Sequence, residues 1–124
     1  MVLNIEVKGL SDVRKFINSK NKRATMLVKR GLSRGAIVVQ GEVKDSIAGN
    51  RAETKSVDTG RFLNSVEINV KLSALSARIF SGLPYVNFLE YGTSSFVGRK
   101  HFSNSANRTK QKVALVIQNE LNKI

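Results

Sequence analysis

The chain has 124 residues, which suits one modest hydrophobic core, so we expect a single domain over residues 1–124. It has no cysteine and a single histidine, which excludes disulfides and thiolate metal sites and argues against a histidine-built zinc site; no metal or cofactor is expected. The net charge of +12 favours an acidic partner, whether nucleic acid, an anionic surface or an acidic protein.

Two observations concern membranes and targeting. The longest unbroken apolar run, Val113–Ile117, is far shorter than the roughly 20 residues that cross a bilayer, so no membrane segment is expected. Residues 1–6 show neither the basic lead nor the apolar stretch of a signal peptide. We therefore expect the protein to be made in a reducing cytoplasm.

The first predicted element is a strand. Residues 3–8 alternate apolar and polar side chains, the period of a half-buried strand, and Gly9 closes the pattern. Ser11 or Asp12 can then cap a short helix that ends near residue 19.

A long helix is predicted from about Asn21 to Ile47. Its apolar residues recur at steps of three and four and form one face: Val28, Leu32, Gly35/Ala36, Val39, Val43 and Ile47. Gly31 and Gly35 are four residues apart and allow a close approach, which we expect to be packing against the sheet. The first half carries a series of cations: Lys20, Lys22, Arg23, Lys29, Arg30 and Arg34. These are either a solvated helix face or a surface for nucleic acid or an acidic protein.

The middle of the chain predicts a loop, a turn and a hairpin. The helix is expected to stop at Ala48-Gly49-Asn50, and the polar run 51–56 to form a mobile loop. Asp58-Thr59-Gly60-Arg61 opens a turn or short helix, with Asp58 as its N-cap. Residues 66–72 and 75–79 alternate apolar and polar side chains and predict an antiparallel hairpin, which other elements must cover. The expected fold is α+β, a small antiparallel sheet built on this hairpin and packed against a long N-terminal helix and a C-terminal helix.

The last third predicts two more helices. Residues 85–91 have helical spacing and end at Gly92, and Thr93 to Lys100 reads as a loop. Ser103 is expected to cap the last helix. Its buried face is Ala106, Val113, Ile117, Leu121 and Ile124, and its exposed side carries Arg108, Lys110 and Lys112.

The chain is not expected to be an enzyme. Asp58-Thr59-Gly60 matches the catalytic tripeptide of retroviral-type aspartic proteases, which are homodimers built almost wholly of strands. Here the aspartate follows a helical pattern, and the adjacent Arg61 would hold its carboxylate ionised instead of letting it share a proton. His101 is expected to be a loop residue, since no second histidine accompanies it. A protease using Asp58 is kept as a distant alternative.

Several motifs, in order, resemble the tail-completion family of long-tailed bacteriophages, also called head-tail joining or neck proteins. The motif residues are Asp58, Thr59, Gly60, Arg61, Tyr85, Phe88, Glu90, Tyr91, Gly92, Thr93 and Phe102. The resemblance extends from about Asp58 to the end of the chain, with the long helix in the family's usual place before it. The chain departs from the family at Ser56-Val57, where a proline is frequent, and at Lys100-His101-Phe102, where Arg-Pro-Phe is frequent.

The resemblance implies a structural protein of the virion. Copies would form a ring, expected to hold six, on the head-proximal end of the tail tube, and the ring would present a surface to the head connector. DNA would pass through its lumen, so the basic helix would face either DNA or acidic neighbours. A stand-alone basic nucleic-acid-binding domain is the main alternative.

The resemblance also gives the motif residues roles. Gly60 would allow a sharp bend, Gly92 would end the short helix, and Thr93 would satisfy the backbone groups freed there. Tyr85, Phe88 and Tyr91 are expected in the core because the short helix supplies few other large apolar groups. Arg61 and Glu90 are expected to pair.

Overall fold

The computed structural model describes residues 2–6, 22–56, 60–71, 76–95 and 97–123. Its elements are β1 (Val2–Glu6), α2 (Lys22–Ile47), α3 (Arg61–Asn64), β2 (Glu67–Lys71), β3 (Ser76–Phe80), α4 (Val86–Tyr91) and α5 (His101–Leu121). The predicted short helix after Ser11, the first part of the Asp58 motif and the hairpin turn lie outside the described residues.

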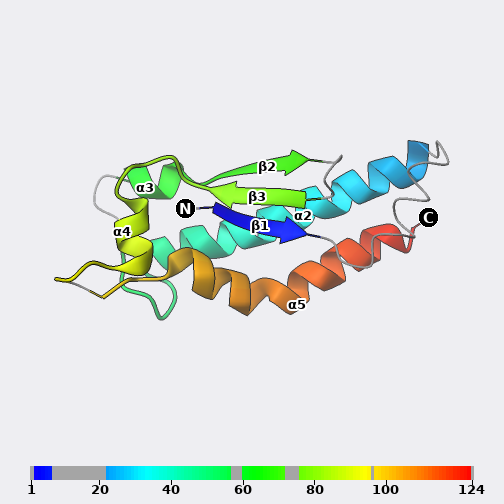
Figure 1. Ribbon diagram of the computed structural model, residues 1–124. Helices are drawn as coiled ribbons and strands as arrows, with labels where there is room; N and C mark the ends of the chain where they lie inside the picture. Colours follow the sequence, from blue (N-terminus) through cyan, green and yellow to red (C-terminus); the bar gives the residue numbers. More distant parts are fainter. Residues whose placement is uncertain (1, 7–21, 57–59, 72–75, 96, 124) are drawn as a thin grey trace.

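The described elements form two layers (Figure 1), with a three-stranded sheet lying over the long helices α2 and α5. The strand order is β1-β3-β2 and both pairings are antiparallel, so the predicted hairpin supplies β2 and the central strand β3. In this register Ile79 of β3 lies between Leu3 and Ile68. The predicted α+β fold is confirmed, and the N-terminal strand extends the sheet by pairing with the free edge of β3.

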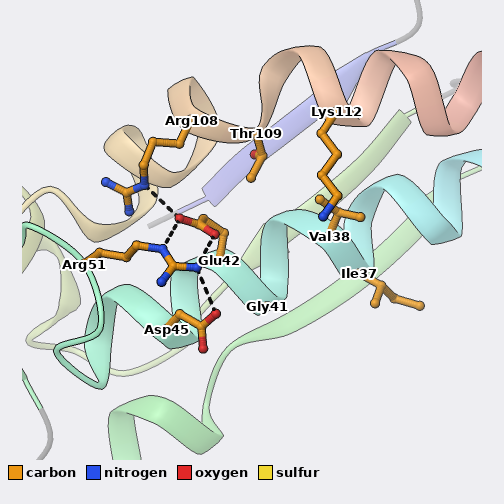
Figure 2. Close-up of a pocket in the computed structure, with 9 residues that line it drawn as sticks. All are labelled: Ile37, Val38, Gly41, Glu42, Asp45, Arg51, Arg108, Thr109 and Lys112. Atoms are coloured by element: carbon orange, nitrogen blue, oxygen red, sulfur yellow. Dashed lines mark hydrogen bonds and ion pairs between the residues drawn. The ribbon is translucent and has the colours of Figure 1, made fainter.

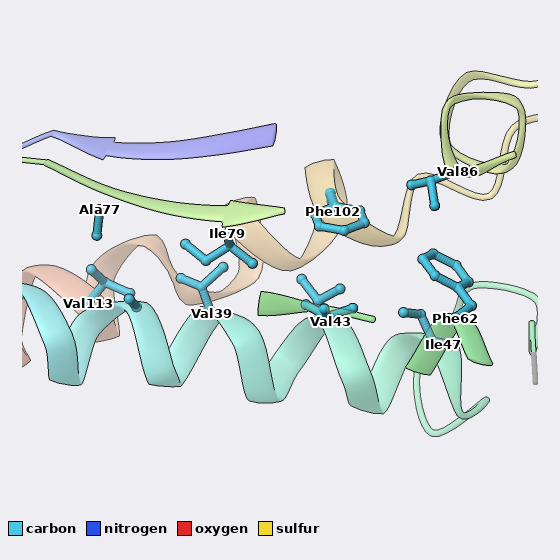
Figure 3. Close-up of a cluster of buried hydrophobic side chains, with 11 residues drawn as sticks. Val39, Val43, Ile47, Phe62, Ala77, Ile79, Val86, Phe102 and Val113 are labelled. Carbon is cyan, nitrogen blue, oxygen red and sulfur yellow. The ribbon is translucent and has the colours of Figure 1, made fainter. Parts of the chain in front are cut away.

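The core lies between α2 and the sheet (Figure 3). The predicted apolar face of α2 is buried along its whole length, with Leu32, Ala36, Val43 and Ile47 fully inaccessible. Because side chains alternate along a strand, Ala77 and Ile79 of β3 both point into this core, where they are also fully inaccessible. Its 26 residues make α2 about 39 Å long, enough to run under the entire sheet.

Helix α5 packs antiparallel against α2. The close approach at Gly31 and Gly35 is used here: a Cβ atom added to Gly31 would lie 3.5 Å from the Cα atom of Ile117. One added to Gly35 would lie 3.1 Å from the side chain of Val113. The expectation that these glycines pack against the sheet was therefore wrong, because the narrow side of α2 faces the second helix.

One end of the molecule collects the short elements. Helices α3 and α4 and the connection into α5 lie together there, while the α5 C-terminus lies at the opposite end (Figure 1). Phe62 of α3, Val86 of α4 and Phe102 of α5 close the core at this end (Figure 3). The rings of Phe62 and Phe102 are tilted by 30° with centroids 6.5 Å apart. The motif residues that the structure describes thus gather at one end of the fold.

Candidate partner-docking surface

Helix α4 is fixed by two inward side chains one turn apart. Val86 is 0% exposed and Glu90 is 1% exposed, so this face of the helix points into the protein. The helix ends at Gly92, as predicted, whose φ of 82° is readily adopted only by glycine. Since α4 has six residues, its stability must come from these tertiary contacts.

The aromatic residues of α4 point outward. Tyr85, Phe88 and Tyr91 are 36%, 57% and 65% exposed. Tyr85 makes an edge-to-face contact with Phe62, with ring centroids 6.3 Å apart. The prediction that these three residues belong to the core was wrong. Val86, Leu89 and Glu90 occupy the inward side of this short helix, so Phe88 and Tyr91 face outward.

A loop segment extends this exposed surface. Val97, 87% exposed, forms an isolated antiparallel bridge with Gly92, directly after the end of α4. The backbone then follows α4, with Arg99 N–H donating to Leu89 O at 2.6 Å. Gly98 permits this approach, because a Cβ there would lie 2.5 Å from Glu90 O. We call Tyr85, Phe88, Tyr91 and Val97 the α4 patch.

Glu90 joins α4 to the start of α5. Its carboxylate accepts hydrogen bonds from the backbone N–H groups of Phe102 and Ser103, at 2.9 and 3.0 Å, and from the Ser103 hydroxyl at 2.6 Å. A buried anion at a helix N-terminus satisfies unpaired N–H groups and complements the helix dipole. These hydrogen bonds lead to α5, and the expected pairing of Glu90 with Arg61 stays a prediction. The expected capping role of Ser103 was wrong, because α5 begins at His101 and Ser103 lies in its first turn.

Other motif residues have local roles. Gly60 is the N-cap of α3 with a φ of 80°, consistent with the bend predicted for it. Thr93 Oγ1 accepts from Ser95 N–H at 3.1 Å, so the backbone group it satisfies belongs to the following turn. Phe102 is fully buried at the head of α5. Asp58 and Thr59 lie outside the described residues.

His101 is a core residue, and the expectation that it lies in a loop was wrong. It occupies the first position of α5, is 0% exposed, and its ring meets the ring of Phe62 at 68°. Its Nδ1 atom lies 2.7 Å from Ser46 Oγ and its Nε2 atom 2.7 Å from Ser56 Oγ. The histidine therefore connects α2, the loop 51–56 and α5.

Glu53 and Arg99 lie at the two ends of this series of hydrogen bonds, and they limit which groups can donate. The Arg99 guanidinium can only donate to Ser56, and the Glu53 carboxylate can only accept from Ser46. Ser46 must then accept from Nδ1–H of His101. Burial of the His101 ring lowers its pKa from the ordinary value, which favours the neutral form, and in that form Nε2 accepts from the Ser56 hydroxyl.

The Ser56–His101 contact has the geometry of a nucleophile and a base, but its surroundings favour a structural role. Ser56 also accepts from Arg99 at 2.8 Å, and the His101 ring is fully enclosed. The groove described below is lined by neither residue. The chain of hydrogen bonds instead holds the loop 51–56, which was expected to be mobile, against α2 and α5.

An ion-pair network strengthens the same junction (Figure 2). Arg108 of α5 binds both oxygens of Glu53, at 2.6 and 2.9 Å. It also binds Glu42 of α2 at 2.8 Å, the contact drawn in Figure 2. Arg51 also binds Glu42, at 2.7 Å. The Arg108 hydrogen bonds lower the pKa of Glu53 to about 2, and the Arg51 hydrogen bond is the main cause of a lowered pKa at Glu42. Arg108 lies on the exposed side of α5, as expected, and its guanidinium also ties α5 to the loop.

This network forms one wall of a groove between α2 and α5 of about 560 Å³ (Figure 2). The groove is lined by Ile37, Val38, Gly41, Glu42, Asp45, Arg51, Arg108, Thr109 and Lys112. Most of its charged groups are already paired with each other. Such a wall has little unsatisfied charge to offer a small ligand.

Two residues of the predicted basic series make contacts within the fold. Arg23 donates to the Lys123 carbonyl oxygen at 2.9 Å and Arg34 forms an ion pair with the buried Glu120, so both tie α2 to the end of α5. Lys29 and Arg30 are exposed. Lys20 and the side chain of Lys22 lie outside the described residues.

The described residues contain neither a metal-binding cluster nor a membrane-spanning helix. Within these segments, no group of three His, Cys, Asp or Glu side chains lies close enough together to hold a metal ion. None of the described helices combines the length and the apolar character needed to span a bilayer.

Sequence patterns did not identify Ser46 and Glu53 as members of the buried network, or His101 as a buried residue. A weak signal existed: Glu53 and Glu42 are among only nine acidic residues in a strongly basic chain, so each is surrounded by candidate cations. Their sequence positions gave no indication of which cations would be near them, because Glu53 and Arg108 are 55 residues apart.

Comparison with known proteins gives one match. The family model described as "Bacteriophage HK97-gp10, putative tail-component" matches residues 11–92, a range that contains α2, the hairpin and α4. Neither the curated proteins nor the solved structures contain a significant match. The match covers well over half of the chain and agrees with the resemblance to tail-completion proteins that the motifs indicated. The chain belongs to the HK97-gp10-like family of bacteriophage tail components.

Proposed function

We propose that this protein completes the head-proximal end of a phage tail and joins it to the head connector. The whole chain acts as one domain and makes no covalent change in its partners. Its partners are further copies of itself in a ring of six, the tail tube protein and the connector proteins. It is located in the virion at the head-tail junction.

The observation that carries this proposal is the exposed α4 patch in a chain of a phage tail family. Large exposed apolar side chains that gather on one element are typical of a contact surface for another protein. The contacts of Glu90 and of the 97–100 segment hold α4 in place. The patch therefore loses little conformational entropy on docking. A ring further requires a heterologous interface that closes on rotation, which a small domain can supply.

DNA passing through the lumen is part of the proposal. Lys29 and Arg30 of the basic series are exposed, and their charges are suited to phosphate. The alternative, a stand-alone nucleic-acid-binding domain, predicts tight duplex binding by the free monomer with a steep salt dependence. Arg23 and Arg34 make contacts with Lys123 and Glu120 within the fold, and this use of two cations argues against that alternative.

The aspartic protease alternative is contradicted by the fold. Such proteases are almost wholly strand, whereas α2 and α5 here have 26 and 21 residues.

Electron microscopy of particles assembled without this protein tests the proposal. We expect filled heads beside unattached tails, and joined particles after the purified protein is added. Joined virions in its absence would refute the proposed function.

A further inference from the structure

The surroundings of the α4 patch are cationic. In the described segments 60–66, 81–95 and 97–102, the cations are Arg61, Arg99 and Lys100, and Glu90 is the only acidic residue. Glu90 is 1% exposed and turned toward α5, so it contributes no accessible acidic surface. The patch therefore has an apolar centre and a basic margin.

The backbones of two of these cations lie against α4. Arg99 and Lys100 N–H groups donate to the α4 carbonyl oxygens of Leu89 and Glu90 at 2.6 and 3.2 Å. The Arg99 guanidinium meets a carbonyl oxygen and a hydroxyl, at Lys55 and Ser56, which leaves its charge without a recorded acidic partner. Arg61 begins α3, next to the ring of Phe62 that contacts Tyr85.

The described residues have little acidic surface to offer in return. In the part of the chain that the structure describes, four acidic residues are in ion pairs: Glu42, Asp45, Glu53 and Glu120. Glu67 is exposed and has no recorded ion pair. A second copy docked on the patch would thus bring cations against cations, which costs free energy and slows association.

We propose that the α4 patch docks a different protein, whose contact surface has an apolar centre and an acidic margin, and that copies of this chain join through other surfaces. This inference rests on the proposed function and identifies the surface that meets the heterologous neighbour at the junction. Burying large exposed apolar side chains favours binding, so Phe88, Tyr91 and Val97 are the expected anchors. The basic margin selects the partner.

A protein fits the patch better than duplex DNA does. Phosphate groups would suit Lys100 and Arg61, but the outer surface of a duplex has no apolar region to cover Phe88 and Val97. A protein surface can pair with both parts of the patch at once.

The probes for the test are the filled heads and unattached tails from particles assembled without this protein. The full-length protein is added to them, and joining is counted by electron microscopy. Binding to each particle type is measured by co-sedimentation at low and high salt. Self-association is measured separately by analytical ultracentrifugation. The variants are Phe88→Ser and Lys100→Glu, and the control is Leu115→Ser, because Leu115 is 61% exposed on α5, away from the patch.

We expect Phe88→Ser and Lys100→Glu each to weaken binding to one particle type at least about tenfold, with self-association unchanged and Leu115→Ser like the wild type. Salt should weaken wild-type binding by screening the basic margin. Wild-type behaviour of both variants in joining, or loss of self-association in Phe88→Ser, would overturn the inference and leave the proposed function intact. Loss of binding to a duplex oligonucleotide in Phe88→Ser, with particle binding retained, would assign the patch to DNA instead. Wild-type protein that fails to join heads to tails would overturn the proposed function and this inference with it.

Discussion

Replacement of Glu53 by glutamine removes the buried negative charge that holds the loop 51–56 against α5. The Glu53 side chain is 3% exposed and accepts hydrogen bonds from Arg108, Ser46 and Asn104. Glutamine has nearly the same shape, so it can still accept from Ser46. Its NH₂ group would face the Arg108 guanidinium, where both groups donate and neither accepts.

The pKa of Glu53 gives the size of the effect. The pKa falls from 4.5 to about 2 on folding, which corresponds to about 3 kcal/mol of stability at neutral pH. Because the folded pKa is the lower one, this stabilisation is fully present above pH 4.5 and is lost as the pH falls toward 2. Glutamine resembles the protonated form, and Arg108 keeps Glu42 as a partner, so we expect Glu53→Gln to lower the free energy of unfolding by about 2–3 kcal/mol at pH 7.

The measurement is urea unfolding of the wild type and Glu53→Gln at pH 7, 4 and 3. The difference between the two proteins should shrink as the pH falls, because the wild type progressively loses what the variant already lacks. Glu67→Gln is the matched control: Glu67 is exposed on β2, and its replacement should change stability by less than about 0.5 kcal/mol. A difference for Glu53→Gln that is under about 0.5 kcal/mol at pH 7, or that is constant with pH, would refute this reasoning.

Three further substitutions test the helices and the α4 junction, each by thermal and urea unfolding. Gly41→Ala should stabilise the protein by up to about 1 kcal/mol, because a Cβ at this exposed helix position meets nothing within 4 Å; a loss of stability would contradict the open surface seen there. Gly98→Ala should destabilise it by more than about 1 kcal/mol, since its Cβ would lie 2.5 Å from backbone atoms of Glu90 and Tyr91; an unchanged melting temperature would mean that this segment does not lie against α4. Glu90→Gln should cost about 1–2 kcal/mol through loss of the buried charge at the start of α5, and a neutral effect would exclude that role.

Local periodicity was sufficient to predict most of the helices and strands of the fold. The helix at 22–47, the hairpin strands and the stop at Gly92 follow from spacing and from glycine, because each depends on neighbours within a few residues. The pairing of β1 with β3 and the packing of Gly31 and Gly35 on α5 depend on partners far along the chain. Periodicity identifies a buried face but does not identify the element that covers it.

The site could be predicted only in part. The motif around α4 was recognised, but Tyr85, Phe88 and Tyr91 were expected in the core because large apolar side chains are usually buried. That rule failed because Val86 and Glu90 already fill the inner face of a six-residue helix. The buried positions of His101 and Glu53 could not be predicted, since a polar residue is buried only where its partners converge.

By itself, the sequence determined the secondary structure, the basic character and the family of this protein, because composition and short-range spacing are properties of the chain alone. The tertiary structure decided which charges are left for a partner. Folding brings Glu42, Glu53 and Glu120 to cations distant in sequence, turns Glu90 inward against α5, and leaves the aromatic residues of α4 at the surface. Opposite charges in a low-dielectric contact are stable only when the fold places them together, and no pattern along the chain records that placement.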